Sequence, residues 1–173
     1  MTINEIIQNE GLNQKINVNG WVKNKRGSKN ITFVSLNDGS TIKNLQVIVE
    51  IKNFSDKTIR ELTTGCCISV SGNLVKSQGS GQNIELIAKK VLILGSSDAE
   101  KYPLQPKKHS LEFLREKAHL RFRTNTFSAV FRIRHSLTYA IHKFFHERGF
   151  YNIHTPIITA ADAEGAGETF QVT

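Results

Sequence analysis

Four side chains between residues 25 and 46 combine positive charge, an aromatic ring and an amide. The cations Lys25 and Arg26 suit phosphate groups, and the ring of Phe33 offers a planar base a stacking surface. Gln46 carries an amide that can donate to and accept from a base edge. Their spacing also fits a Phe33 in the core and a Gln46 that is merely a solvated break in a strand. The residue types alone leave both interpretations open.

A second group of reactive side chains lies near the end of the sequence, at Asp162, Glu164 and Glu168. These carboxylates stand among Ala and Gly, and small neighbours allow a backbone to approach an amine or another small cation. The same composition is typical of a surface turn. The pattern therefore does not decide between a binding site and a turn.

Metal and phosphate-loop chemistry have less support in the sequence. His142 and His146 are four residues apart, but they do not form an HExxH pattern and have no evident third ligand. Gly79 and Gly81 fall in a predicted hairpin tip and belong to no phosphate-binding glycine motif. We expect no metal site, and we expect the two histidines to lie on a solvated helix face.

The composition favours a polyanionic partner. The 173 residues include 23 Lys and Arg against 15 Asp and Glu, a formal net charge of +8. No apolar run is long enough for a membrane span, and the first residues do not resemble a secretory signal, so we expect a cytoplasmic protein. The neighbouring Cys66 and Cys67 predict one buried thiol beside a more exposed one, as in a reducing compartment.

The spacing of apolar residues predicts the strands and helices that carry these side chains. Alternation with a period of two predicts strands, and a helical segment separates the third from the fourth. The predicted elements are strands from Lys15, Ile31–Leu36 and Leu45–Ile51, a helix at Ser55–Leu62, and strands Cys66–Val75 and Ile84–Leu94. This order predicts the five-stranded Greek-key barrel that binds oligonucleotides, the OB-fold.

The remaining sequence predicts mostly helix. Thr2 and Glu5 match a capping box at the start of a short first helix. Pro103 and Pro106 mark a linker, and a short helix is expected after Ser110. A long amphipathic helix is predicted from Thr126 to about Arg148, closed by Gly149 and followed by a short strand at Phe150–His154.

Beyond these patterns, the sequence resembles the anticodon-binding domain of bacterial asparaginyl-tRNA synthetases and the segment that follows it. The resemblance covers essentially the whole chain, and the motifs after residue 108 are the more specific. The motifs that carry it are Gly20–Val22, Asn37–Gly39, Thr63–Cys66, Val70–Gly72, Ile84–Leu86, Tyr102–Pro103, His109–Arg115, His119–Arg121, Arg123–Asn125, Thr155–Thr159 and Glu164–Glu168.

The resemblance implies a class II aminoacyl-tRNA synthetase of the aspartyl, asparaginyl and lysyl subgroup. Such enzymes use ATP and Mg²⁺ to activate an amino acid and esterify it to tRNA. Arg26, Phe33 and Gln46 match family positions that contact the anticodon, where the Phe stacks on a base and the Gln contacts the central uridine. Lys25 is the other basic residue of this group. The implied partner is the anticodon stem-loop of tRNA-Asn.

The long helix and the segment to Pro156 resemble motif 1 of class II synthetases. The resemblance implies a homodimer interface that includes Phe131, Phe144 and Pro156. Glu164 matches a family residue near the α-amino group of the amino acid, where a carboxylate offsets the ammonium charge through a charge-assisted hydrogen bond.

Two departures from the family pattern stand out. Phe122 replaces a proline that is common between two arginines, which loosens a turn without removing a chemical group. The 173 residues also contain no counterpart of motifs 2 and 3, which hold ATP and metal. We therefore expect no catalytic residue among them and no ATP–pyrophosphate exchange by this chain alone.

The expected organisation is an OB-fold anticodon-binding domain at 1–95, a linker at 96–125 and the start of a class II catalytic domain at 126–173. Three alternatives remain open. One is an aspartyl-tRNA synthetase, including a form that charges both tRNAs, since the two share the barrel and the central uridine. Another is a free-standing tRNA- or single-strand-binding module, and the third is a structural dimerisation domain.

Overall fold

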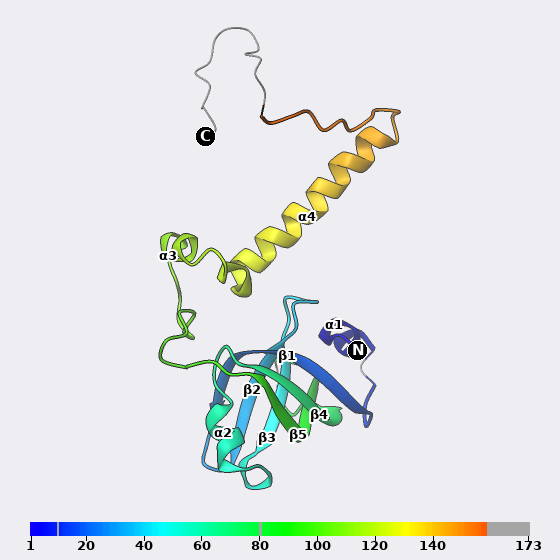
Figure 1. Cartoon of the computed structure of the whole chain (residues 1–173). Coiled ribbons are helices and arrows are strands. Elements are labelled where there is room, and N and C mark those ends of the chain that lie inside the picture. The colour runs from blue at the N-terminus through cyan, green and yellow to red at the C-terminus, as the bar shows by residue number, and fades with distance from the viewer. Residues whose placement is uncertain (10, 80, 159–173) are drawn as a thin grey trace. The chain divides into compact units, whose positions relative to one another are not determined.

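The computed structural model describes residues 1–9, 11–79 and 81–158. The chain divides into two compact units, Met1–Phe131 and Arg132–Thr173. The first unit contains a β-barrel with its helices and the linker, and the second contains most of a long helix (Figure 1).

Five strands close into a barrel in the order β1-β2-β3-β5-β4. All neighbouring strands are antiparallel except β3 and β5, which run parallel. A short helix, α2 (Asp56–Glu61), separates β3 from β4, as predicted, and confirms the OB-fold order. The strands are β1 (Lys15–Gly27), β2 (Ile31–Asn37), β3 (Leu45–Glu50), β4 (Cys67–Lys76) and β5 (Ile84–Gly95).

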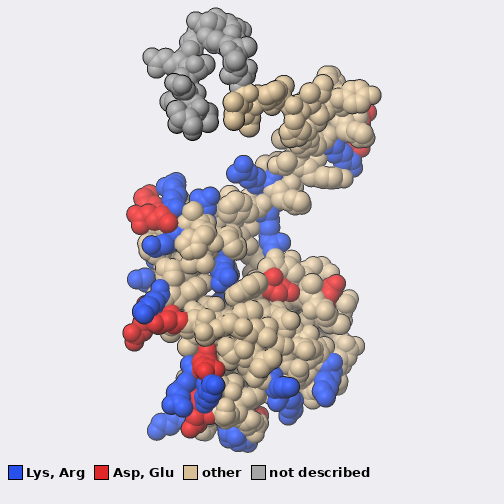
Figure 2. All heavy atoms as spheres, in the orientation of Figure 1, with Lys and Arg blue, Asp and Glu red and all other residues tan. Residues whose placement is uncertain are grey.

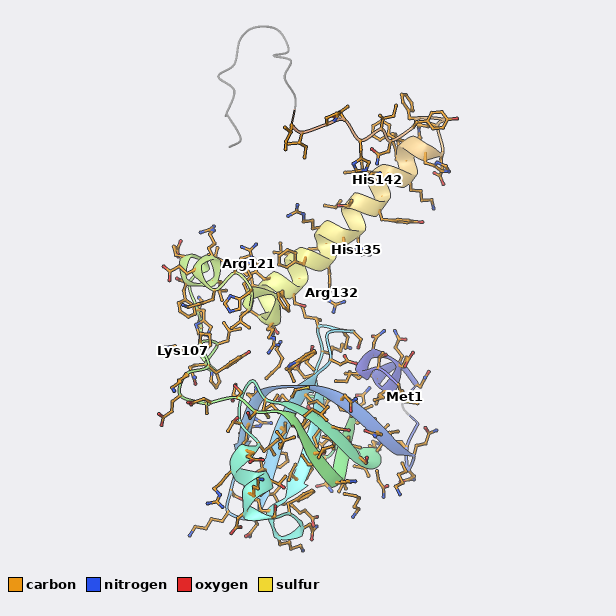
Figure 3. The ribbon with its side chains drawn as sticks, in the orientation of Figure 1. Met1, Lys107, Arg121, Arg132, His135 and His142 are labelled. Carbon is orange, nitrogen blue, oxygen red and sulfur yellow. The ribbon has the colours of Figure 1, made fainter. Side chains whose placement is uncertain are left out.

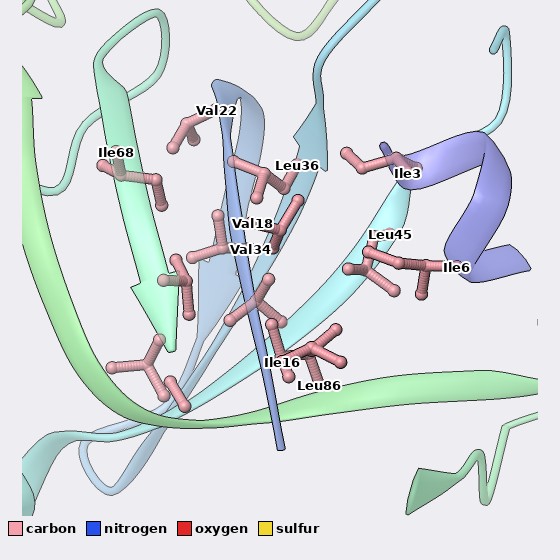
Figure 4. Close-up of a cluster of buried hydrophobic side chains, with 14 of the residues drawn as sticks. Ile3, Ile6, Ile16, Val18, Val22, Val34, Leu36, Leu45, Ile68 and Leu86 are labelled. Atoms are coloured by element: carbon pink, nitrogen blue, oxygen red, sulfur yellow. The ribbon is translucent and has the colours of Figure 1, made fainter. Parts of the chain in front are cut away.

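Alternating side chains fill the barrel. In β2, residues Thr32, Val34 and Leu36 are buried while the residues between them are partly exposed. β3 has the same period, so successive side chains point to opposite faces of the sheet. The close-up in Figure 4 shows the resulting aliphatic core. The outward-facing residues of β2 and β3 are therefore not part of the core.

Helix α1 (Ile3–Asn9) contributes Ile3 and Ile6 to this core. The predicted capping box is present: Thr2 N–H donates to Glu5 Oε2 at 2.7 Å, and Glu5 N–H donates to Thr2 Oγ1 at 3.2 Å. The turn after β2 supplies further caps, because Ile3 N–H donates to Asp38 Oδ2 at 2.8 Å. The helix is thus attached to the barrel by both packing and hydrogen bonds.

Three helical segments follow the barrel: α3 (Leu111–Glu116), the 3-10 turn η2 (Arg121–Arg123) and α4 (Asn125–His146). Ser110 caps α3 by accepting from Phe113 N–H, and Leu114 is buried. After α4, Gly149 has a φ of +81°, and its N–H donates to the carbonyl of His146 at 3.0 Å. Gly149 therefore ends the helix as predicted.

The predicted strand at Phe150–His154 is wrong, because these residues are not in a strand in the structure. A β-strand requires a neighbouring strand to satisfy its backbone groups, and within the described part of the chain no segment pairs with this one. The local sequence cannot supply that partner.

The cysteine prediction is confirmed, since Cys66 is buried and Cys67 is partly exposed, both as free thiols. Burial raises the pKa of the Cys66 thiol and keeps it protonated. Separately, a search of residues 1–9, 11–79 and 81–158 finds no helix with the length and apolar character that crossing a membrane requires.

Candidate nucleic-acid interface

The outer face of β2 and β3 carries the aromatic ring and the amide that the sequence singled out. Phe33 is partly exposed because its neighbours Thr32 and Val34 take the inward positions. Gln46 alternates in the same way with the buried Leu45 and Val47. Neither residue belongs to the core, so the structure rules out a core position for Phe33.

Strand register brings Arg26 to the same face. Arg26 lies opposite Phe33 in the β1–β2 ladder, and Ser35 lies opposite Gln46 in the β2–β3 ladder. The Arg26 guanidinium carbon is 5.9 Å from the centroid of the Phe33 ring, and its Nη2 donates to Gln46 Oε1 at 3.4 Å. A cation, a ring and an amide therefore converge on one surface, which can contact a phosphate, a base plane and a base edge.

The amide nitrogen of Gln46 has a partner on β5 that sequence reasoning missed. Gln46 Nε2 donates to Glu85 Oε1 at 2.8 Å, and the same oxygen accepts from Ser77 Oγ at 2.8 Å and from Gln82 Nε2 at 2.7 Å. Glu85 is only 5% exposed. The sequence did contain a signal for this contact, namely a carboxylate between the apolar Ile84 and Leu86. A charge buried in an apolar strand requires hydrogen-bonding partners.

Lys25 does not join this group. It lies opposite the buried Val34 in the β1–β2 ladder, and its Nζ donates to the carbonyl of Ile59 in α2 at 3.0 Å. Burial lowers the pKa of the Lys25 ammonium. Its ammonium is thus engaged by α2, whereas Arg26 is exposed on the outer face.

The tryptophan of β1 faces the linker within the first unit. The Arg123 guanidinium carbon lies 5.0 Å from the centroid of the Trp21 ring, a cation–π distance. Two residues further along β1, Lys23 Nζ donates to Asn125 Oδ1 at 2.9 Å. Burial lowers the pKa of Lys23. These contacts attach Arg123 and the first residue of α4 to the barrel, a role that the sequence did not reveal.

The residues predicted for a dimer interface lie on or after α4. Phe131 has the Arg121 guanidinium carbon 5.5 Å from its ring centroid, and Figure 3 shows Arg121 near the start of that helix. Phe144 is 49% exposed and has the Arg148 guanidinium carbon 3.6 Å from its ring centroid. Pro156 is exposed after the helix. Glu164 lies outside the described residues.

Basic side chains are not confined to one patch. Figure 2 shows Lys and Arg spread over the displayed face, with acidic side chains between them. The histidines of α4, including the labelled His135 and His142, lie along the helix (Figure 3). Among the residues that the structure describes, no three His, Cys, Asp or Glu gather as a metal site would require. The exposed Phe33 ring and the Gln46 amide therefore locate the candidate site better than the distribution of charge does.

Known protein families match the two parts of the chain separately. Residues 16–94 match the family described as OB-fold nucleic acid binding domain, and these residues contain the closed barrel and its outer face. Residues 110–173 match the family described as tRNA synthetases class II (D, K and N).

Similarity to curated proteins extends over nearly the whole sequence. The chain is 56% identical over 169 residues to an asparagine–tRNA ligase of Parabacteroides distasonis, covering 98% of this chain and 36% of that protein. It is 53% identical over 173 residues to that of Cytophaga hutchinsonii, covering 99% of this chain and 37% of the relative. The chain thus spans about a third of the length of these relatives.

Solved structures share the fold at lower identity. An asparaginyl-tRNA synthetase of Pyrococcus horikoshii complexed with asparaginyl-adenylate matches with a TM-score of 0.81 at 20% identity, covering 96% of this chain and 38% of that one. A putative aspartyl-tRNA synthetase from Leishmania major Friedlin matches with a TM-score of 0.78 at 20% identity, and the match covers 93% of this chain and 34% of that one.

The barrel, its outer face and the class II sequence after it define one class of protein. The chain belongs to the class II aminoacyl-tRNA synthetases of the aspartyl, lysyl and asparaginyl group. Within that group, the curated sequences that it matches at 53–56% identity are asparagine–tRNA ligases.

Proposed function

We propose that the chain is the anticodon-binding part of an asparagine–tRNA ligase, which activates asparagine with ATP and Mg²⁺ and esterifies it to tRNA-Asn. The observation that carries this proposal is the convergence of Arg26, Phe33 and Gln46 on the outer face of β2 and β3. Its support is the 56% identity to asparagine–tRNA ligases over nearly the whole chain.

Each of the three side chains has a proposed task at the anticodon. Phe33 stacks on a base, Gln46 hydrogen-bonds the edge of the central uridine, and Arg26 neutralises a nearby phosphate. Lys25 adds positive charge near this face while its ammonium remains on the Ile59 carbonyl. We assign none of the described residues to ATP or Mg²⁺.

The proposed division of the chain is a barrel domain at 1–95, a linker at 96–125 and the start of the catalytic domain at 126–173. Glu164 is proposed to contact the α-amino group of asparagine through its carboxylate. The proposed location is the cytoplasm, where free thiols such as Cys66 and Cys67 are normally found.

The decisive experiment is aminoacylation by the longer protein that contains this chain, with asparagine and aspartate tested in parallel against tRNA-Asn and tRNA-Asp. We expect esterification of asparagine to tRNA-Asn. Transfer of aspartate to both tRNAs would instead support the aspartyl alternative. Failure to charge any tRNA, together with binding of an anticodon stem-loop by residues 1–173, would favour a binding module.

We also propose that α4 forms a homodimer interface through an apolar face that includes Phe131 and Phe144, together with Pro156. In support, Phe144 and Phe145 are about half exposed, and so are Ile141 and Leu137. Sedimentation of the longer protein should give a dimer, and Phe144→Ser should shift it toward monomer. Leu94→Ser, at an apolar side chain of β5 that is 52% exposed and lies outside this segment, is the matched control and should leave the dimer intact.

A further inference from the structure

One nitrogen of Arg121 is buried without a hydrogen-bond partner. Among residues 1–9, 11–79 and 81–158, its Nε is the only buried side-chain nitrogen or oxygen in this condition. The ion pairs within the same ranges do not include Arg121 either. A buried donor on a cation costs free energy when it is unpaired, and folded proteins normally supply an acceptor. The described part of this chain does not supply one.

The rest of Arg121 is held in place by the first turns of α4. Its guanidinium carbon lies 5.0 Å from the ring centroid of Phe127 and 5.5 Å from that of Phe131. These two ring centroids are 6.3 Å apart. The Arg121 carbonyl accepts from Thr124 Oγ1 at 2.6 Å and from Thr124 N–H at 3.0 Å. The guanidinium is therefore positioned before any acceptor arrives.

The chemistry of the guanidinium defines the acceptor. When the faces of the group pack on rings, its N–H donors remain in the plane, where the two oxygens of a carboxylate can accept from neighbouring nitrogens. An RNA phosphate could do the same, but Arg121 packs on α4 and not on the outer face of β2 and β3. Stacked arginines are typical of ion pairs buried within and between proteins. The location thus favours a protein carboxylate.

We propose that Arg121 binds a carboxylate supplied by the part of the longer protein that lies outside residues 1–173. The inference rests on the proposed function, which makes this chain about a third of a ligase whose catalytic domain begins with α4. Because Nε is covered in the chain alone, a small movement of the side chain accompanies the pairing. The ion pair then holds the start of α4 against the catalytic domain.

The test is amide hydrogen exchange at Thr124 and Ser128 in both the 173-residue chain and the longer protein. These N–H groups donate to the carbonyls of Arg121 and Thr124. In the 173-residue chain, Arg121→Met removes only the contacts with the rings, so exchange should speed up by at most about tenfold. In the longer protein it also leaves a carboxylate unpaired, and exchange should speed up by about a hundredfold or more.

Arg115→Met is the matched control, at an exposed arginine of α3 that pairs with Glu112 at 3.8 Å, and should leave exchange unchanged in both proteins. An equal acceleration by Arg121→Met in the two proteins would overturn the inference, because Arg121 would then act only through the rings. An effect that appears only when tRNA is bound would also overturn it and would indicate an RNA phosphate. Aminoacylation by the wild type tests the proposed function separately and is unaffected by either result.

The same measurement identifies the subunit that supplies the carboxylate. In a longer protein made monomeric by Phe144→Ser, an effect of Arg121→Met that persists assigns the carboxylate to the same chain. Loss of the additional effect assigns it to a second copy. A crystal structure of the longer protein should show a carboxylate oxygen within about 3 Å of a guanidinium nitrogen of Arg121. Water alone at these nitrogens would overturn the proposal.

Discussion

Phe33 owes its position to its neighbours in β2. Thr32 and Val34 occupy the inward sites, which leaves the ring on the outer face with Arg26 beside it. An exposed ring in a strand costs free energy of apolar hydration, and the proposed stacking with a base would compensate for that cost.

Removing the Phe33 ring should weaken RNA binding. For Phe33→Ala we expect a loss of about 1–3 kcal/mol in the free energy of binding an anticodon stem-loop, the usual value for one base stacked on an aromatic ring. Fluorescence anisotropy with a labelled stem-loop measures this. Leu92→Ala, which also removes an exposed apolar side chain from the barrel, is the control and should bind like the wild type. Equal losses in the two variants would contradict a stacking role.

Asp38 makes the attachment of α1 sensitive to acid. Burial disfavours its ionised form, but hydrogen bonds from Ser40 Oγ, Ile3 N–H and Ser40 N–H together outweigh burial and lower the pKa of Asp38 below its ordinary 3.8. A lowered pKa stabilises the fold at pH values above the unfolded pKa, and this contribution disappears as pH falls through the folded pKa.

We therefore expect Asp38→Asn to lower the melting temperature more at pH 7 than at pH 2.5, because the stabilisation from the ionised carboxylate decreases as the pH falls below the ordinary pKa of an Asp. Melts followed by circular dichroism at the two pH values give the comparison. Asp56→Asn, at the first position of α2, is a control for the loss of one carboxylate. The same temperature difference between Asp38→Asn and wild type at both pH values would show that the charge contributes nothing.

At the scale of single elements, α1 packs one of its faces against the core of the barrel. Ile6 is 1% exposed, whereas the adjacent Ile7 is only partly buried. Ile6→Ala should lower the free energy of unfolding by about 2–5 kcal/mol, because it leaves a cavity beside the barrel. Ile7→Ala makes the same change in the same helix and should cost clearly less. Urea denaturation measures both, and a larger loss for Ile7→Ala would contradict the packing of α1.

The elements differed in how well the sequence predicted them. The strands of the barrel and α2 were predicted because their period and turn residues are local properties, written in segments such as Ile31–Leu36. Phe150–His154 was mistaken for a strand because strand formation depends on a distant partner. Glu85 was missed for a related reason: its three donors lie on β3 and in the β4–β5 connection, and only the folded barrel brings them together.

For the site residues, too, local properties were predictable from the sequence and long-range contacts were not. Period two favoured an outward Gln46, but it could not decide whether Phe33 faced the core, because the strand register was unknown. The register also explains why Lys25 and Arg26, adjacent in sequence, take different partners. Residue type thus predicted the chemistry of the site, whereas its assembly required the ladder between strands.

At the scale of the first compact unit, the contact between Trp21 and Arg123 couples the barrel to the chain before α4. Trp21 is the only tryptophan in the sequence, so a change in tryptophan emission can be assigned to the surroundings of this ring. Arg123→Ala should shift the emission to longer wavelength and should speed amide exchange at Thr124 by roughly two- to tenfold, as expected for a cation–π contact.

Arg115→Ala serves as the control for this experiment, because Arg115 is an exposed arginine of α3 that pairs with Glu112 at 3.8 Å. It should leave the emission of Trp21 and the exchange at Thr124 unchanged. Identical spectra for Arg123→Ala and wild type would mean that Trp21 and Arg123 do not hold this segment on the barrel.

The position of β5 between β3 and β4 sets when the barrel can form during synthesis. The first three strands leave the ribosome as a meander, but β3 has no second neighbour until Ile84–Gly95 has emerged, about forty residues later. At typical elongation rates of 5–20 residues per second, this delay lasts about two to eight seconds. Glu85 arrives with the same strand. The surface around Gln46 is therefore completed in the step that closes the barrel, and a nascent chain stalled before residue 84 has neither.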